Sequence, residues 1–489
     1  MMEAKTGQAI LVVDFGTSKL HAVYISLENG MSLGEAERPY DWDVMEDNRA
    51  VVNPETLWVN SQRCLDDLLR QETLEYVEIA AMVFSFLGDN FICMDGHDHV
   101  LYPLIAGSDW RAKDDMPEIE RQINTHDYAK ITGTPLDCDL SFPRMYWIKK
   151  HEGEIFSRTK KFYSLQQYIM RKMGLEPLSD YSLAARTAMY DLQEDRWNGR
   201  LMDILGISDD MLGKVCPAGT VVGTIEKYGD VKLPQKVPVI LGGHDAMEGF
   251  IGLGFHPKGT PGMIGNLAGS YNLVGLPWNE FRNTDDVWIF GLMPGLGSVP
   301  GSYHFQAGDN MQPTVRWFVE AFLTGVGMGL NDMSAKVKYD ASCAIRMSRD
   351  PLTGDGCFEG ISVSTRIEDL FTALMEAHTF RLRELYDVVT QLIGEPFSCM
   401  RVGAGGAKAD NLNQFKADFF GIRVERVKNL QASAVGAAVI AAVGMGAYQS
   451  FEDAIKNMVS ISKVFEPDVA IGSQYREKFK IFQRDKGKL

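Results

Sequence analysis

The stretch that decides the fold is Ala9–Ser18, AILVVDFGTS. Its five leading apolar residues predict a buried β-strand, and the short polar segment that follows them predicts a tight turn. Apolar residues resume at Ala22–Ile25, before a second turn at Glu28–Gly30. We therefore expect the chain to begin with a β-hairpin, in which an aspartate lies next to a loop of small residues.

Alternating strand and helix patterns continue outward from this hairpin. Residues 55–71 have the apolar spacing of a helix, and residues 76–94 return to a strand pattern with Gly88 and Asp89 in the middle. The pattern is mostly helical from 162 to 205, and 237–241 is another buried strand. A glycine-rich stretch follows that strand, and we expect a hinge between two domains there.

The second half of the chain begins like the first. A strand at Met263–Ile264 leads into the polar turn Ala268–Ser270 and a second strand at Leu273–Val274. Further on, the patterns predict a helix at 366–393, a strand at 399–402, a glycine turn at 403–406, a helix to about 420, a strand at 422–427 and a long alanine-rich helix. The repeat of strand, small-residue turn and strand at the start of both halves predicts a duplicated α/β architecture, with lobes at 1–247 and 248–489.

Length and composition agree with a two-domain globular protein. The 489 residues exceed what one compact core organises, and the net charge is -16 without any block rich in lysine or arginine. We therefore expect no nucleic-acid partner, although an acidic protein can still bind ATP through backbone N–H groups. The seven cysteines contain no C-x-x-C pair. The N-terminus does not resemble a signal peptide. The uncharged run Ala432–Ser450 is rich in alanine and glycine, which favours a packed helix over a membrane span. A cytoplasmic protein is expected.

Three segments carry residues suited to chemistry. In Asp14–Ser18, small residues let backbone N–H groups converge on an anion, and the aspartate can hold Mg²⁺; the alternative is a hairpin turn with a capping aspartate. In Gly242–Asp245 the carboxylate ends a buried strand and can act as a general base, or it can serve as a helix N-cap. Gly403–Lys408 suits a nucleotide at a helix N-terminus, or is only a glycine-rich turn. Neither a Rossmann fingerprint nor a Walker sequence is present.

Taken in this order, these residues resemble the FGGY carbohydrate kinases, relatives of xylulokinase, fuculokinase and glycerol kinase. The segments that carry the resemblance are Leu11–Ser18, Asp180–Arg186 with Tyr190–Leu192, Gly242–Asp245, Gly405–Lys408 and Ala432–Ala438. The resemblance implies an α/β fold of two ribonuclease H-like lobes, as in actin-like ATPases, around a central cleft. It also implies transfer of the γ-phosphoryl group of MgATP to a hydroxyl of a small sugar.

The resemblance further assigns roles to individual residues. Asp245 is implied as the base that takes the proton of the sugar hydroxyl, and Asp14 and Asp245 as the residues near Mg²⁺. The implied nucleotide contacts are Gly16, Thr17, Ser18 and Lys19 from one lobe, and Gly269, Ser270, Gly405 and Gly406 from the other. The implied sugar contacts are Gly88, Asp89, Asp109, Trp110, Arg111 and Asp245.

Some residues depart from the family pattern. His21 stands where a basic residue is usual, and Lys19, two residues earlier on the same strand face, is a candidate substitute. The second phosphate loop reads Gly-Ser-Tyr, and the segment Ser85–Asn90 lacks the Gln-Met-His of xylulokinases. The sugar is therefore left open: a pentulose or hexulose is expected by resemblance, with polyols and aldonates as alternatives. A homodimer is also left open.

Two other functions compete with a kinase. A non-catalytic nucleotide and sugar sensor is suggested by His21 and the altered loop, and an actin-like chaperone ATPase would share the fold. His97 and His99 could hint at a metal, but the segment reads as a hairpin turn, and of the tryptophans only Trp110 is favoured as a sugar contact. The kinase hypothesis requires Asp14 and Asp245 to face each other across a gap between the lobes, with the metal-bound triphosphate between them.

Overall fold

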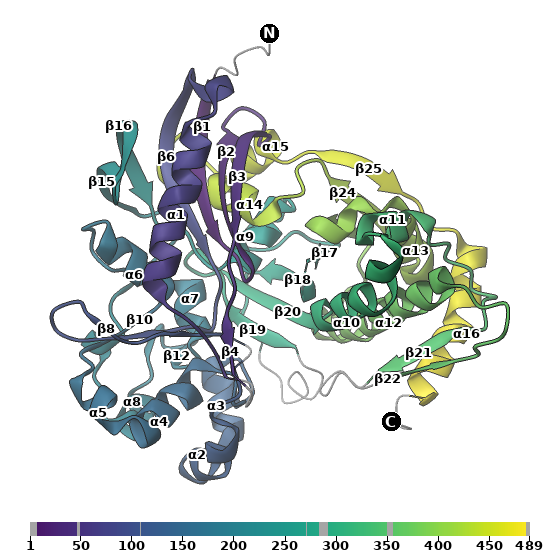
Figure 1. Cartoon of the computed structure of the whole chain (residues 1–489), viewed down its shortest axis with the longest axis horizontal. Coiled ribbons are helices and arrows are strands. Elements are labelled where there is room, and N and C mark those ends of the chain that lie inside the picture. The colour runs from purple at the N-terminus through teal and green to yellow at the C-terminus, as the bar shows by residue number, and fades with distance from the viewer. Residues whose placement is uncertain are drawn as a thin grey trace.

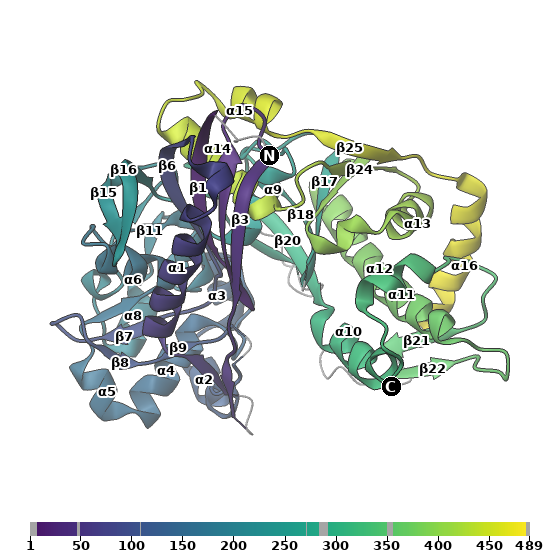
Figure 2. The same ribbon diagram turned by 45° about the horizontal axis from the view of Figure 1, so that its top comes forward.

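Two large β-sheets, each flanked by helices, form the body of the molecule (Figure 1). The computed structural model describes residues 7–45, 49–107, 109–269, 271–282, 292–349 and 356–485. In the view of Figure 2 the first half of the chain lies on the left and most of the second half on the right.

The first sheet has the strand order β15-β16-β6-β1-β2-β3. These strands are β1 (Gly7–Phe15), β2 (Lys19–Ser26), β3 (Ser32–Pro39), β6 (Val77–Phe86), β15 (Val221–Tyr228) and β16 (Val231–Ile240). Strands β16, β6 and β1 run parallel, so their carboxyl ends meet at one edge, whereas β2 and β3 are antiparallel. The hairpin predicted at the N-terminus is confirmed, and its turn lies at this edge.

The second sheet repeats the central order of the first. Its strands run β19-β20-β18-β17-β23-β24-β25. They are β17 (Met263–Ala268), β18 (Tyr271–Trp278), β19 (Met293–Leu296), β20 (Tyr303–Asn310), β23 (Cys399–Gly403), β24 (Arg423–Val427) and β25 (Ile461–Phe465). As in the first sheet, three parallel strands (β24, β23, β17) are followed by two antiparallel ones (β18, β20). The predicted duplication is therefore confirmed at the level of strand order.

Helices α9 (Asp245–Gly252) and α14 (Ala432–Gly444) pack against each other between the two sheets (Figures 1 and 2). Small residues are needed there, because a Cβ on Gly436 would lie 1.7 Å from the carbonyl oxygen of Glu248. The alanines and valines of α14 share a core with Ile10, Val12 and Val23 of the first sheet. The alanine-rich segment is thus a packed helix, as predicted. Among the described residues, no helix combines the length and apolar character that a bilayer span requires.

The other helices and the short strands lie outside these two sheets. In the first half they are β4 (Asp43–Val44), β5 (Ala50–Val52), α1 (Pro54–Leu69), β7 (Ile92–Met94), β8 (Val100–Tyr102), β9 (Leu104–Ile105), α2 (Met116–Gln122), α3 (Thr125–Thr132), α4 (Ser141–His151), α5 (Gly153–Arg158), β10 (Lys161–Tyr163), α6 (Leu165–Lys172), β11 (Ser179–Asp180), α7 (Tyr181–Arg186), β12 (Tyr190–Asp191), β13 (Arg196–Trp197), α8 (Gly199–Leu205) and β14 (Val215–Cys216). In the second half they are α10 (Gln312–Phe318), α11 (Leu330–Lys336), β21 (Arg346–Arg349), β22 (Gly356–Glu359), α12 (Ile367–Ile393), α13 (Asp410–Phe420), α15 (Phe451–Met458) and α16 (Val469–Asp485).

Helix α7 begins at an N-cap that the sequence indicated. The Asp180 carboxylate accepts hydrogen bonds from the backbone N–H groups of Ser182 and Leu183, at 2.9 and 3.0 Å. The region 162–205, expected to be mostly helical, also contains the short strands β11, β12 and β13. The lobe boundary predicted after residue 247 falls inside α9 and stays a prediction.

Candidate active site

Asp14 lies near the carboxyl end of β1, paired in register with Ser85 of β6. Its carboxylate is half-buried, and its Oδ1 atom has no hydrogen-bond partner in the described part of the chain. Burial raises the pKa of Asp14, although His21, the Ser85 hydroxyl and Lys19 act in the opposite direction. A carboxylate that only capped the hairpin turn would bind the turn's N–H groups, so the alternative of a capping aspartate is not supported.

Asp245 is placed by a tight glycine segment that follows β16. A Cβ on Gly242 would lie 1.9 Å from the carbonyl oxygen of Phe84, and one on Gly243 would lie 2.7 Å from the Asp180 carboxylate. At Gly242 only glycine fits, because two backbones approach each other closely there. Asp245 is then the first residue of α9, with 30% of its side chain exposed. The helix N-cap is His244, and it makes no side-chain capping bond, so the alternative of Asp245 as the N-cap is wrong.

The two carboxylates act on each other. Burial, followed by the negative charge of Asp14, raises the pKa of Asp245 to about 7. Burial and the charges of Asp14 and Asp245 together raise the pKa of the Tyr40 hydroxyl. The pair therefore comes together, as the kinase hypothesis requires. The expectation that the two carboxylates face each other across a gap between the lobes is wrong in one respect: both stand at the carboxyl edge of the first sheet, at the ends of β1 and β16.

The loop Gly16–Lys19 next to Asp14 presents unused N–H groups. Its carbonyl oxygens on Gly16 and Thr17 accept hydrogen bonds from the Tyr40 hydroxyl and the Trp42 indole, at 2.5 and 2.8 Å. The N–H groups of Thr17 and Ser18, both exposed residues, have no acceptor among the described residues. Such an arrangement suits an anion.

The two basic residues near this loop both have acidic partners on β3. The Lys19 ammonium pairs with Glu37, and His21 Nε2 lies 3.3 Å from Glu35. His21 is buried and Lys19 is half-exposed. Both residues lower the pKa of Asp14, so either lies close enough to act on an anion bound there. Which of the two takes the place of the family's usual basic residue stays a prediction.

In the second half, the loop after β23 lies against the β17–β18 turn. A Cβ on Gly406 would lie 2.8 Å from the carbonyl oxygen of Ala268, next to Gly269, whereas Gly405 faces open space. These loops therefore meet at the carboxyl ends of β17 and β23, as the glycines predicted for the nucleotide require. Ser270, the remaining predicted nucleotide contact, lies outside the described residues.

A buried cation lies under the β17–β18 turn. Lys416 of α13 is 1% exposed, and its ammonium donates to Asn266 Oδ1 at 2.7 Å. Asn266 in turn donates to Asn272 Oδ1 at 2.8 Å. Burial lowers the pKa of Lys416 to about 7, and no opposing negative charge contributes.

Near Asp245, Asp89 pairs with Arg186. The Arg186 guanidinium donates to Asp89 Oδ2 at 2.6 and 3.2 Å, and Asp89 adopts a left-handed backbone with φ of 57°. A Cβ on Gly88 would lie 2.8 Å from His244 Nε2 and 3.2 Å from Arg186. Arg186 was not among the predicted site residues. The available signal was its place at the end of the quoted segment Asp180–Arg186.

His244 lies between this ion pair and Asp245. Its Nε2 atom is 3.3 Å from Asp245 Oδ1, and its Nδ1 atom is buried without a partner among the described residues. Burial, and to a smaller extent the charge of Arg186, lower the pKa of His244 to about 3. The imidazole is therefore neutral at physiological pH, and its contact with Asp245 is not an ion pair.

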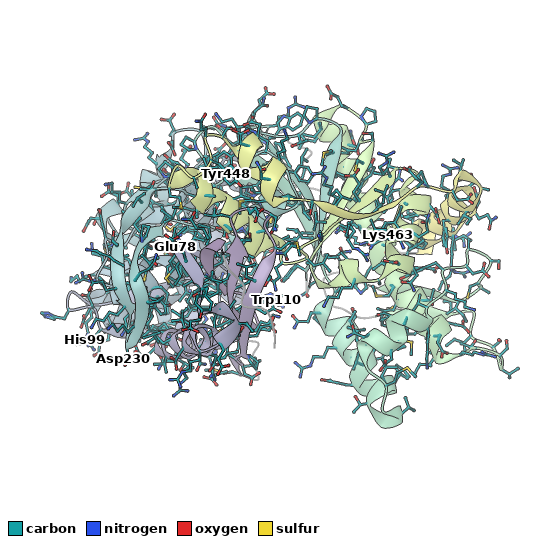
Figure 3. The ribbon with its side chains drawn as sticks, turned by 90° about the horizontal axis from the view of Figure 1, so that it is seen from above. Glu78, His99, Trp110, Asp230, Tyr448 and Lys463 are labelled. Atoms are coloured by element: carbon teal, nitrogen blue, oxygen red, sulfur yellow. The ribbon has the colours of Figure 1, made fainter. Side chains whose placement is uncertain are left out.

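Asp109 and Arg111 form an ion pair with each other, which occupies most of their polar atoms. Arg111 Nε and Nη2 donate to the two oxygens of Asp109 at 2.8 and 2.7 Å, and both side chains are fully buried. Asp109 also accepts from the backbone N–H of Ala50 at 2.7 Å. Trp110, between them, is 41% exposed, and Figure 3 shows it on the side of the first half that faces the second half. Of the predicted segment, Trp110 is thus the residue with surface free for a ligand.

Arg144 is a second residue that the sequence did not single out. It is fully buried, and its guanidinium donates to the carbonyl oxygens of Asp89 at 2.8 Å, of Leu140 at 3.1 Å, and of Ala106 and Asp139. One side chain thereby ties together three loops around the Asp89–Arg186 pair. Burial lowers the pKa of Arg144, against the charges of nearby aspartates.

Carboxylate oxygens are the donors that Mg²⁺ prefers, usually one or two of them together with substrate phosphates. The unpartnered Oδ1 of Asp14 and the half-exposed carboxylate of Asp245 fit this requirement. Within the described residues no group of three acidic, histidine or cysteine side chains could hold a metal by itself. His97 and His99 belong to the hairpin turn between β7 and β8, as predicted, and Figure 3 places His99 at the outer edge of the molecule.

Comparisons with known proteins agree with this geometry. Residues 9–252 match the model of the N-terminal domain of the FGGY family of carbohydrate kinases, and residues 346–445 match that of its C-terminal domain. The chain is 24% identical to a gluconokinase of Bacillus subtilis (97% of this chain, 94% of the relative) and 25% identical to an autoinducer-2 kinase of Enterobacter sp. (94% and 90%). The structure is similar to that of a ligand-bound xylulose kinase from Lactobacillus acidophilus, with a TM-score of 0.85, 19% identity and coverage of 99% and 98%.

Proposed function

Because the chain belongs to the FGGY family of carbohydrate kinases, we propose that it transfers the γ-phosphoryl group of MgATP to a hydroxyl of a small sugar, with Asp245 as the general base. The observation that carries this proposal is the Asp245 carboxylate, held beside Asp14 with a pKa raised to about 7. A base whose pKa lies near the working pH is ionised for part of the population and still takes a proton readily.

The acceptor hydroxyl is oriented from the first half of the chain. Arg186 and Asp89 lie on one side of Asp245 and leave the buried Oδ1 of Asp89 unpartnered for a substrate hydroxyl. His244 stays neutral, so it can exchange a hydrogen bond with the substrate through Nδ1 without adding charge. Asp245 takes the proton as the hydroxyl attacks phosphorus, which prevents charge from building up on the nucleophile. Trp110 adds an apolar face, and Asp109 and Arg111 hold it in place.

The nucleotide binds mainly to the second half of the chain. The N–H groups of Thr17 and Ser18 contact phosphate from the first sheet, with Lys19 as an exposed cation beside them, and Gly269 contacts it from the second. Adenosine lies against Gly405 and Gly406, where side chains are absent. Asp14 and Asp245 would hold Mg²⁺, which would supply positive charge to neutralise the phosphates. Closure of the two halves keeps water from competing with the sugar hydroxyl.

A pentulose or hexulose is the acceptor we propose. The relatives named above act, by their names, on gluconate, on autoinducer-2 and on xylulose, so family membership alone leaves the acceptor open.

A coupled ADP-release assay with pentuloses, hexuloses, polyols and sugar acids tests the proposed function. We expect one class of acceptor to stimulate ADP release far above the rate with water, and the phosphorylated product to carry the label of γ-³²P-ATP. Tight ATP binding without stimulation by any acceptor would contradict the proposal and support a non-catalytic sensor.

A further inference from the structure

Asp139 is a carboxylate beside the acceptor site that the reaction described above does not use. It lies between α3 and α4, and its side chain is half-buried. Its carbonyl oxygen and that of Asp89 accept hydrogen bonds from the same nitrogen, Nη2 of Arg144. Because one nitrogen atom binds both carbonyls, the two loops are fixed next to each other.

The carboxylate of Asp139 makes no hydrogen bond or ion pair with any described residue. Its charge acts on Asp89 and Arg186, and it raises the pKa of Tyr271 from the second half of the chain. Burial, and then the charges of Asp137 and Asp89, raise the pKa of Asp139 to about 6, so the group is mostly ionised above pH 7. The shared contact with Arg144 Nη2 therefore places Asp139 next to the Asp89 loop, on the acceptor side of the site.

The charges around the acceptor site do not balance. The charge of Asp89 acts on both Asp139 and Asp245, and the cations next to these carboxylates are Arg186 and Arg144. Arg186 already pairs with Asp89, and the Arg144 guanidinium is occupied by backbone carbonyls. The internal segments outside the described residues (46–48, 108, 270, 283–291 and 350–355) contain no lysine or arginine.

Two buried polar atoms indicate that a ligand completes this site. Asp89 Oδ1 and His244 Nδ1 are both without a partner among the described residues, and the His244 side chain is 9% exposed. A buried polar atom without a partner is costly, and a substrate rich in hydroxyls satisfies such atoms. Hydroxyls donate to carboxylates, whereas a carboxylate on the substrate would meet an excess of negative charge.

We propose that Asp139 is a specificity residue of the acceptor site: its carboxylate accepts hydrogen bonds from hydroxyls of an uncharged ketose or polyol and repels sugar acids. This inference rests on the proposed function and narrows its substrate class.

The test compares an uncharged acceptor with the sugar acid of the same chain length in the ADP-release assay. The wild-type protein is expected to prefer the uncharged acceptor. Replacing Asp139 with Asn should lower kcat/KM for that acceptor about 10- to 100-fold, mainly through KM, because hydrogen bonds to charged groups are worth this much. The same variant should raise the kcat/KM of the acid relative to the uncharged acceptor, and the KM for ATP should not change.

Two further variants separate charge from structure. Asp139→Glu keeps the charge and should keep the discrimination against acids while it weakens acceptor binding. Asp137→Asn removes the same charge two residues away, from an exposed side chain that bonds its neighbouring Cys138 N–H, and should leave the discrimination nearly unchanged.

Several outcomes would overturn the inference: a wild-type preference for sugar acids or for amino sugars, or an unchanged ratio of acid to uncharged acceptor in Asp139→Asn. If no acceptor at all stimulates ADP release by the wild-type protein, the proposed function itself fails, and that result is distinguishable from a failure of the inference.

Discussion

The β1–β2 and β17–β18 hairpins have the same backbone plan and opposite chemistry. Each forms the centre of a sheet with the same strand order, and each turn begins with a glycine, Gly16 or Gly269. Two residues before that glycine stands Asp14 in the first hairpin and Leu267 in the second. The duplicated scaffold therefore positions loops, and single substitutions at its strand ends decide which loop carries charge.

The surroundings of the two hairpins extend this contrast. The first lies near the carboxylates of Asp89 and Asp245, whereas the second has the buried side chain of Lys416 beneath it. Carboxylates can bind a metal ion and accept the proton of a hydroxyl. A cation together with small residues can bind phosphate. We expect variants of the first half to affect acceptor chemistry, and variants of the second half to affect the nucleotide.

The largest effect is expected at Asp245. Asn at this position keeps the shape and removes the base, so kcat should fall by about 100- to 10,000-fold, the usual contribution of a general base. ATP binding, measured by calorimetry without Mg²⁺, should stay nearly unchanged because the proposed direct contacts to phosphate and adenosine come from other residues. Full turnover in the variant would remove Asp245 from the reaction.

The pH dependence of the rate sharpens the role of the first half. Since burial and Asp14 raise the pKa of Asp245 to about 7, the base is protonated below that pH and cannot accept a proton. We expect kcat/KM to fall about tenfold for each pH unit below 7 and to level off above it. The residual activity of Asp14→Asn should show a lower midpoint, because a repelling charge is gone. A wild-type profile that is flat between pH 5.5 and 8 would contradict this assignment.

Lys416→Met tests the second half. Folding lowers the pKa of Lys416 to about 7, from about 10.4 in the unfolded chain. Between these two pH values the unfolded chain binds more protons than the folded one. The contribution of Lys416 to the free energy of unfolding therefore rises with pH across that window. The burial cost is largest below pH 7, and there the methionine variant should be more stable by about 1–4 kcal/mol in urea unfolding. Its KM for ATP should rise severalfold while the acceptor KM stays constant. Loss of stability at pH 6 would show that the ammonium stabilises the fold.

The smallest effect is expected at Ala404, which precedes Gly405. Its φ of 66° and ψ of -177° belong to a region that glycine adopts without strain. Ala404→Gly should therefore stabilise the protein by about 1 kcal/mol in chemical denaturation, with little change in activity. A destabilised glycine variant would mean that the Ala404 methyl group contributes packing that outweighs the strain.

Local patterns were enough to predict most of the elements. Apolar runs and glycine turns correctly indicated the strands of both hairpins, helix α12, the N-cap at Asp180 and the packed helix α14. The reason is that strand and helix periods, caps and turns are properties of contiguous residues. The same locality explains why the predicted loops around Gly16, Gly242 and Gly405 lie at strand ends.

Contacts between distant segments could not be predicted in the same way. That Asp14 and Asp245 share one sheet edge depends on the order of β1, β6 and β16, which no local pattern contains. Asp89 finds Arg186 nearly a hundred residues away. Within the segment around Trp110, local sequence did not reveal that Asp109 and Arg111 would bind each other. In sequence, an acidic and a basic residue two positions apart are compatible with an ion pair and with ligand binding alike. Only the burial of both side chains in the structure distinguishes these two roles.

The central claim is that the acids of the first hairpin region and the small residues of the second bind opposite ends of one reaction. A crystal structure of the Asp245→Asn protein with MgATP and its best acceptor tests it most directly. We predict adenosine against Gly405 and Gly406, phosphates at the N–H groups of Thr17 and Ser18, and the acceptor hydroxyl between residue 245 and Asp89. Phosphates bound away from Asp14, or an acceptor bound on the second half of the chain, would contradict the account.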